Sequence, residues 1–174
     1  MLILTSHLHA VITTKFGADY RMHALGKGNA VNYGGISRVA MNLSLRDSLT
    51  KLRTDRIDIF FVHFWDYTST IEEVMDALHV LIQQGKVMYL GVSNTPAWVV
   101  SAANTYARAH GKTPFVIYQG SWSLVQRDLE RDVIPMARQF GMASKFSCGG
   151  AVERAGSLAN TGIHSQPIRC SWRR

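Results

Sequence analysis

Apolar residues along the chain alternate between short continuous runs and longer stretches in which they recur every three or four positions. Short runs bounded by turn residues are typical of buried strands, and the longer repeat is typical of amphipathic helices. The pattern predicts strands at 11–16, 57–64, 87–92 and 115–118, with a helix after each one. Strands that alternate with helices in this way predict an α/β fold built on a parallel sheet.

The helix after the second strand has the clearest signals. Ser69 and Glu72 have the spacing of a capping box, apolar residues from Ile71 to Ile82 form one stripe, and Gly85 is a typical stop. Two later helices are expected at 96–110 and 129–140. The helix before it is expected from the apolar positions Met41, Leu45, Leu49 and Leu52.

The chain of 174 residues divides into three segments that differ in composition and in the regularity of their hydrophobic pattern. Residues 1–10 are atypical, residues 11–143 have the regular strand and helix pattern, and residues 144–174 are rich in Ser and Gly with no sustained period. We therefore expect one domain followed by a poorly ordered basic tail. The abrupt change at 144 and the unusual start indicate a truncated chain.

Charge and composition exclude several classes of protein. The net charge is +7, but residues 144–174 supply +4 of it, and no helix-turn-helix, RNP or zinc-finger motif is present, so we expect no nucleic-acid partner. No apolar run approaches the roughly 20 residues that span a bilayer, and no secretory signal is evident, which predicts a soluble cytoplasmic chain. Cys148 and Cys170 form no CxxC motif, so neither a metal site nor a disulfide framework is expected.

Polar residues stand at the carboxyl ends of all four predicted strands: Lys15, His63, Ser93 with Asn94, and Gln119. In α/β folds this end of the sheet binds ligands, because the strand-to-helix loops converge there. Each residue also has a structural interpretation. Lys15 could be a solvated charge, His63 a half-buried hydrogen-bonded histidine, Ser93 or Asn94 the N-cap of the next helix, and Gln119 a loop amide.

Several motifs occur in register around these positions: TKF at 14–16, VHFWD at 62–66, GVSN at 91–94 and YQGSW at 118–122. In order and spacing they resemble the aldo-keto reductase superfamily, and most of all its fungal aryl-alcohol dehydrogenase branch. The resemblance extends over about residues 11–143. It implies a partial (β/α)8 TIM barrel that contains about strands three to six or seven.

The resemblance also implies an activity, namely NADPH-dependent reduction of a small aldehyde or ketone, or the reverse oxidation of an alcohol. In the family, the residue matched by Lys15 perturbs a catalytic Tyr, and the one matched by His63 hydrogen-bonds the substrate carbonyl. Ser93, Asn94 and Gln119 match the residues that hold the nicotinamide carboxamide. Fungal members often act in secondary-metabolite pathways, so a carbonyl or alcohol of that kind is the implied substrate.

The sequence departs from the family at both ends. The family's catalytic Tyr and its partner Asp have no counterpart, and the spacing of Tyr20 and Tyr33 does not show that either one replaces the Tyr. After GMA at 141–143, the strand with a stacking aromatic residue and the loop that grips the cofactor's 2′-phosphate are missing. We therefore expect weak NADPH binding and little or no activity in this copy. The alternative is a non-catalytic remnant that associates with another chain or with itself through open sheet edges.

Overall fold

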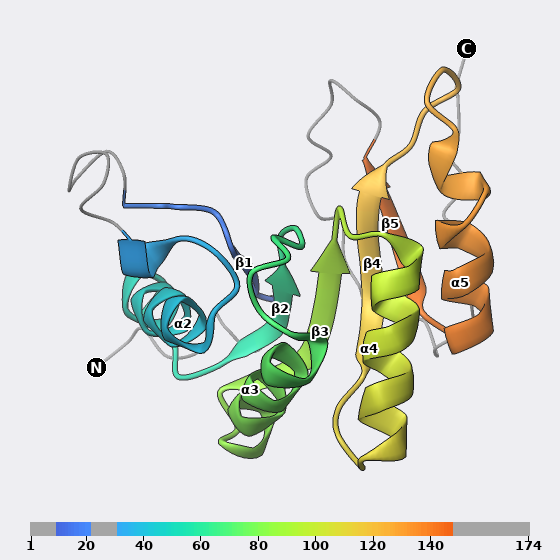
Figure 1. Ribbon diagram of the computed structural model, residues 1–174. Helices are drawn as coiled ribbons and strands as arrows, with labels where there is room; N and C mark the ends of the chain where they lie inside the picture. The colour runs from blue at the N-terminus through green and yellow to red at the C-terminus, as the bar shows by residue number, and fades with distance from the viewer. Residues whose placement is uncertain (1–9, 22–30, 148–174) are drawn as a thin grey trace.

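The computed structural model describes residues 10–21 and 31–147, which form one parallel five-stranded sheet with helices (Figure 1). The strands are β1 (Thr13–Phe16), β2 (Ile57–Val62), β3 (Val87–Ser93), β4 (Phe115–Ser121) and β5 (Ala143–Ser147). They lie side by side in chain order. The four predicted strands and the α/β class are therefore confirmed.

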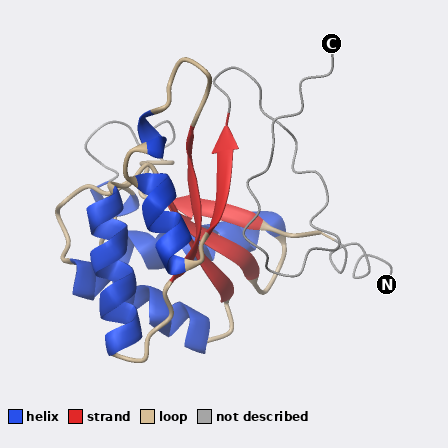
Figure 2. Cartoon of the chain, turned by 90° about the vertical axis from the view of Figure 1, so that its right-hand side faces the viewer, coloured by secondary structure: helices blue, strands red, loops and turns tan. Residues whose placement is uncertain are grey.

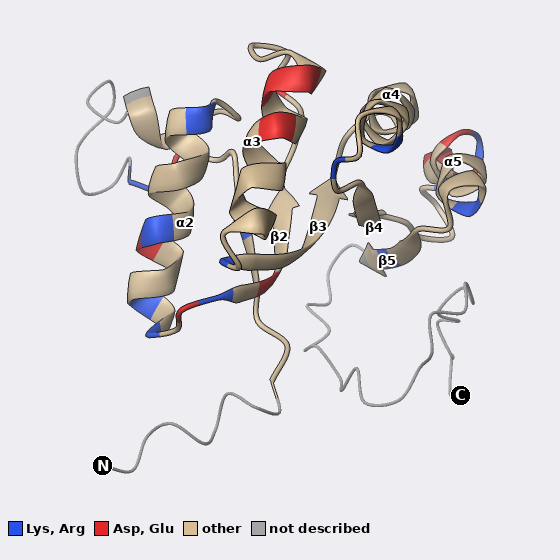
Figure 3. Cartoon of the chain, turned by 90° about the horizontal axis from the view of Figure 1, so that it is seen from below, with Lys and Arg blue, Asp and Glu red and all other residues tan. Residues whose placement is uncertain are grey.

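A helix follows each of the first four strands: α2 (Arg38–Leu52), α3 (Ile71–Gln83), α4 (Ala97–Ala109) and α5 (Val133–Phe140). Short 3-10 turns precede α2 at Val31–Tyr33 (η2) and α5 at Asp128–Glu130 (η3). Figures 2 and 3 show these helices on one side of the sheet. Strand, helix and next parallel strand thus repeat as successive units of a partial (β/α)8 barrel.

Three helix starts differ from the sequence prediction. Thr70, not Ser69, is the N-cap of α3, because its hydroxyl accepts the Glu73 N–H at 3.2 Å. Pro96 is the N-cap of α4, so neither Ser93 nor Asn94 has that role. The expected start of α5 at 129 was also early, because residues 128–130 form the 3-10 turn and the carboxylate of Asp132 accepts the N–H of Val133.

Strand β5 crosses the boundary that the sequence placed at 143. Residues 144–147 pair with β4, whereas the sequence predicted a poorly ordered segment there. The sequence ASKFS has no apolar run, so its pairing depends on the neighbouring strand rather than on its own propensity. Cys148, Cys170 and the rest of the expected tail lie outside the described residues, as do residues 1–9.

The main hydrophobic core lies between the sheet and the helices. Phe60 and Val62 of β2 and Leu90 and Val92 of β3 point into it. We call the opposite side of the sheet the inner face. Its central row is Lys15, Phe61, Gly91, Ile117 and Ala143, which are neighbours in register across all five strands.

Gly91 allows this row to pack. A Cβ atom at position 91 would lie 2.4 Å from the Phe61 ring, so the ring fills the space where a side chain would stand. Phe61 is only 4% exposed as a result. The inner face therefore has an apolar floor at the level of Phe61 and Ile117.

Candidate active site

Four of the predicted site residues, Lys15, His63, Ser93 and Gln119, lie toward the carboxyl edge of the inner face. Lys15 lies beside Phe61, and Ser93 lies beside Gln119. Val62 is paired with Val92, so His63 follows β2 at the level at which Ser93 ends β3. The backbone N–H of His63 donates to the Phe16 carbonyl at 2.9 Å, which fixes the start of this loop against β1.

The Lys15 side chain lies along the inner face and contacts the neighbouring strand β2. Its Nζ atom lies 5.6 Å from the centroid of the Phe61 ring. Partial burial lowers the pKa of Lys15 below its ordinary value, and the positive charge of Lys145 on β5 lowers the pKa further. The lysine is thus in a site that is electropositive before any ligand binds.

His63 is half-buried beside this lysine. Burial lowers the pKa of the imidazole, and the charge of Lys15 adds to the effect. Both causes favour the neutral ring, which carries one N–H donor and one acceptor. At neutral pH, His63 can therefore donate a hydrogen bond to an oxygen without being charged.

Ser93, Asn94 and Gln119 form a connected polar group at the ends of β3 and β4. Ser93 is 1% exposed, and its Oγ accepts the Asn94 side-chain amide at 3.3 Å. The Asn94 backbone N–H donates to the Gln119 carbonyl at 3.2 Å. Asn94 has a φ of 46°, a left-handed conformation that Asn tolerates better than most residues. Within residues 10–21 and 31–147, the Gln119 side-chain amide forms no hydrogen bond with another described residue.

The two tyrosines that follow Lys15 are held in a separate cluster beside α2. The Tyr20 hydroxyl donates to Asp47 at 2.8 Å, and burial together with this carboxylate raises the pKa of Tyr20 to about 12. The Tyr33 ring packs edge-on against Tyr20, with the Arg21 guanidinium 4.8 Å from its centroid. Neither tyrosine is therefore placed as a proton donor beside His63.

Sequence reasoning missed the contribution of β5. Lys145 pairs with Gln119 and shares the inner face with it. Phe146 pairs instead with Gly120, so it lies on the opposite face, where its ring is 6.3 Å from that of Trp122. Only the strand register reveals these positions, because the five residues of β5 have no recognisable period.

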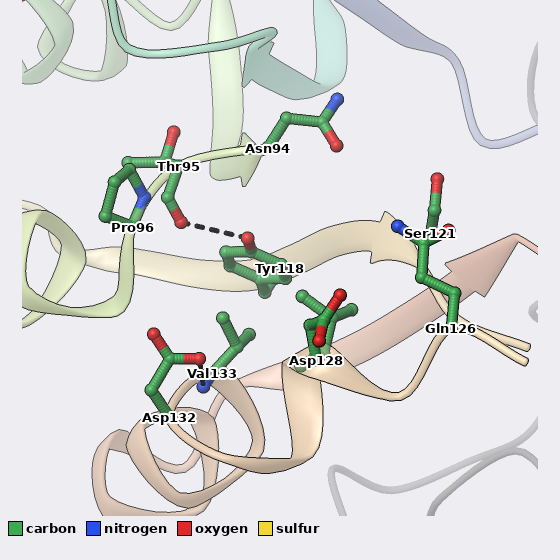
Figure 4. Close-up of a pocket in the computed structure, with 10 residues that line it drawn as sticks. Asn94, Thr95, Pro96, Tyr118, Ser121, Gln126, Asp128, Asp132 and Val133 are labelled. Atoms are coloured by element: carbon green, nitrogen blue, oxygen red, sulfur yellow. Dashed lines mark hydrogen bonds between the residues drawn. The ribbon is translucent and has the colours of Figure 1, made fainter.

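A cavity of about 440 Å³ adjoins the polar group on the helix side of β4 (Figure 4). The Tyr118 hydroxyl within it donates to the Thr95 carbonyl at 2.9 Å. Asn94 is the one predicted site residue in its lining, and Asp128 and Asp132 make that lining acidic. Apart from Asn94, which borders both, the cavity and the inner face are thus separate environments.

No group of three or more candidate metal ligands occurs in the part of the chain that the structure describes. In the same residues, no helix is both long enough and apolar enough to cross a bilayer.

Comparisons with known proteins agree with the motifs in the sequence. The model of the Aldo/keto reductase family matches residues 5–146. Over 133 residues the chain is 65% identical to the putative aryl-alcohol dehydrogenase AAD10 of Saccharomyces cerevisiae, covering 76% of this chain and 46% of the relative. It is 63% identical over 133 residues to the aldo-keto reductase ausK of Emericella nidulans, covering 76% of this chain and 33% of that relative.

A third relative carries a cofactor in its name. The chain is 58% identical over 135 residues to "Aryl-alcohol dehydrogenase [NADP(+)]" of Phanerodontia chrysosporium, covering 76% of this chain and 35% of the relative. The chain thus spans less than half the length of each of these curated relatives.

Proposed function

Because the chain belongs to the aldo/keto reductase family, we propose that its inner face forms part of a site for NADPH-dependent reduction of an aldehyde or ketone, or for the reverse oxidation of an alcohol. The observation that carries the proposal is the meeting of Lys15, His63, Ser93 and Gln119 at one edge of the sheet. The relatives named as aryl-alcohol dehydrogenases make an aromatic aldehyde the first substrate to test.

The polar group at the ends of β3 and β4 fits a nicotinamide carboxamide. A carboxamide has a donor edge and an acceptor edge, and the Asn94 and Gln119 amides complement both. The buried Ser93 hydroxyl already accepts from Asn94 and has its own proton left to donate. When bound, the cofactor supplies the hydride, and these side chains orient the ring that carries it.

His63 and Lys15 act on the substrate side of the same edge. The neutral His63 imidazole donates its N–H to the carbonyl oxygen and orients the substrate. The nearby ammonium of Lys15 stabilises the negative charge that grows on that oxygen. Once protonated, His63 can also deliver the proton that the product alcohol requires, and its lowered pKa confines this role to acidic solution.

Cofactor binding by this chain should be weak. The only aromatic residue of β5, Phe146, shares a face with Gly120 and not with Gln119, so it is not placed to stack on a ring that Gln119 holds. We expect an NADPH Kd weaker than about 1 µM, since stacking and charged phosphate contacts contribute much of the affinity in such sites.

A fluorescence titration with NADPH tests the proposed site. Replacement of Gln119 by Ala should weaken binding about fivefold, the effect of losing one neutral hydrogen bond. Gln84→Ala is the matched control, because Gln84 caps the end of α3, before β3 begins. Equal affinities of the two variants would contradict the assignment of Gln119, and submicromolar binding by the unaltered chain would contradict the expected weak site.

Self-association is a second part of the proposal. β1 and β5 each pair with a single neighbour in the described sheet, and unpaired strand edges favour contact with another chain. Sedimentation velocity over a range of concentrations tests it. A concentration-dependent rise in mass is expected, and a constant monomer mass would overturn this part.

A further inference from the structure

Strand β4 carries an extra residue near its start, relative to its neighbour β3. Leu90 is the register partner of Phe115, but the next residue, Gly91, is the partner of Ile117. One step along β3 thus corresponds to two steps along β4, and Val116 is the additional residue. An extra residue of this kind is a β-bulge, which bends the strand and redirects the side chains that follow it.

The bulge determines which face of the sheet Gln119 occupies. Successive side chains of a regular strand point to opposite faces, so Phe115 and Gln119, four positions apart, would share a face. Phe115 and Tyr118 are instead both buried in the helix-side core, although they are three positions apart. The alternation therefore changes at the bulge, and Gln119 lies on the inner face beside Ser93. A slip of one residue would exchange the faces of Tyr118 and Gln119.

A buried amide on α4 holds the residue at which the bulge begins. Asn104 is 0% exposed, and its Oδ1 accepts the Phe115 N–H at 2.8 Å while its Nδ2 donates to the Phe115 carbonyl at 3.1 Å. The same Nδ2 lies 3.5 Å from the sulfur of Met142, just before β5. An amide carries both a donor and an acceptor, so one side chain satisfies both backbone groups. Phe115 is thereby fixed against α4, which runs beside β4 (Figure 1).

We propose that Asn104 is a positioning residue of the nicotinamide site: it holds Phe115 at the start of the bulge and so keeps Gln119 on the inner face beside Ser93. Asn104 belongs to the helix side of the sheet, so it acts only through β4. The inference rests on the proposed function for the role of Gln119, whereas the position of Gln119 can be measured with no cofactor present.

NADPH titrations of single and double variants test whether Asn104 acts through Gln119. Asn104→Ala should weaken NADPH binding about fivefold, as Gln119→Ala does, because both remove the hydrogen bond that Gln119 makes. In the Gln119→Ala background, Asn104→Ala should cause no further loss. Val100→Ala is the matched control and should leave the affinity unchanged. Val100 is a fully buried residue four positions earlier on α4, and its truncation removes apolar atoms but no hydrogen bond.

Asn104→Asp tests the hydrogen bonds while keeping the shape of the side chain. The ionised carboxylate accepts the Phe115 N–H but has no donor for the Phe115 carbonyl, and the protonated form supplies both. The neighbours of this side chain, the Phe115 backbone and the Met142 sulfur, do not titrate. The NADP⁺ affinity of Asn104→Asp, relative to the unaltered chain at the same pH, should therefore recover as the pH falls, and that of Asn104→Ala should not. NADP⁺ is the probe because it is stable in acid.

NMR reads the strand register with no cofactor present. Nuclear Overhauser contacts between Gly91 and Ile117 report the register that follows the bulge. They should persist in Val100→Ala and weaken in Asn104→Ala, each measured at a temperature at which circular dichroism shows a folded chain. If Asn104→Ala does not fold, Asn104→Asp at neutral and acidic pH provides the same comparison.

Two results would overturn the inference. They are unchanged Gly91–Ile117 contacts in the folded Asn104 variant, and additive losses of NADPH affinity when its substitution is combined with Gln119→Ala. If the unaltered chain binds no NADPH, the proposed nicotinamide site is wrong, and the NMR register still decides whether Asn104 places Gln119.

Discussion

The two faces of the sheet carry different kinds of side chain. On the helix-covered face, Phe60, Val62, Leu90 and Val92 are fully buried and contact other apolar residues. On the inner face, Lys15, Gln119 and Lys145 stand among a few apolar neighbours. The difference indicates that the first face determines the fold, whereas the second carries groups suited to binding and catalysis at some cost in stability.

The same contrast separates two charged clusters. Beside α2, Arg21 and Arg46 both pair with Asp47, which also accepts the Tyr20 hydroxyl. On the inner face, Lys15 and Lys145 form no ion pair with an acid in the described ranges. The Asp47 cluster therefore stabilises the structure, whereas the inner-face lysines contribute no such ion pair among the described residues.

The largest expected effect concerns catalysis. We expect this chain to reduce an aromatic aldehyde such as veratraldehyde about 10² to 10⁴ times more slowly than a full-length relative, the usual contribution of a general acid. Tyr20 and Tyr33 are both engaged beside α2, so the donor that we propose is His63. NADPH oxidation followed at 340 nm measures the rate. A rate within about tenfold of the relative, or an unchanged rate in His63→Ala, would show that another residue donates the proton.

Next in size is the effect of removing a core side chain from the helix-covered face. Leu78→Ala should reduce the free energy of unfolding by about 3 kcal/mol, because Leu78 is fully buried and its removal leaves a cavity. Ile117→Ala on the inner face should cost only about 1 kcal/mol, since that side chain is half-buried. Urea denaturation compares the two variants. If Leu78→Ala and Ile117→Ala lowered the free energy of unfolding equally, the inner face would be packed as tightly as the core.

Gly91→Ala tests how closely the Phe61 ring packs against position 91 on the inner face. The new methyl group would meet the Phe61 ring at 2.4 Å and should destabilise the chain by about 2 kcal/mol. Adding Phe61→Leu should restore part of the loss, because the smaller side chain leaves room for the methyl group. The same denaturation experiment checks both. If the effects of Gly91→Ala and Phe61→Leu on the free energy of unfolding were simply additive, the Phe61 ring would not lie against position 91.

A smaller effect is expected from the pH dependence of the Asp47 cluster. Burial alone would raise the pKa of Asp47, but hydrogen bonds from Tyr20, Arg21 and Arg46 lower it below its ordinary value of 3.8. The cluster's stabilisation is therefore present above that value and is lost as the pH falls through the lower folded-state pKa. Asp47→Asn should remove about 1 kcal/mol at pH 7 and flatten the acid limb of the stability curve. Asp55→Asn, at an exposed position, is the control.

The smallest effect is the titration of His63. Its pKa should lie below 6.5, because burial and Lys15 both disfavour the imidazolium. Lys15→Met should raise this pKa toward the ordinary value, and Lys51→Met, in the last turn of α2, should leave it unchanged. The His63 ring signals in proton NMR report the midpoint. A His63 pKa above 6.5 would require an acidic neighbour, and none acts on His63 among the residues that the structure describes.

The sequence predicted more of the fold than of the site. Strands such as 57–62 and 87–92 are apolar runs that must be buried, so local pattern and tertiary structure agree there. Thr70 replaced Ser69 as a cap because both residues can cap, and only packing decides between them. Lys145 could not be predicted, because its place beside Gln119 follows from pairing with a distant strand.

The positions of Lys15, His63, Ser93 and Gln119 were predictable for a simple reason. Parallel strands bring their carboxyl ends to one edge, so residues at those ends meet even when they are far apart in sequence. The engagement of Tyr20 by Asp47, by contrast, could be learned only from the structure.

The most direct test of the central claim is NMR observation of the side-chain amides during NADPH addition. Gln119 and Gln84, assigned from their Ala variants, report the inner-face edge and a remote helix end, respectively. If the polar group at the ends of β3 and β4 holds the nicotinamide carboxamide, the Gln119 amide signals shift progressively while those of Gln84 do not. Unchanged Gln119 signals at saturating NADPH, or equal shifts at both positions, would contradict the account.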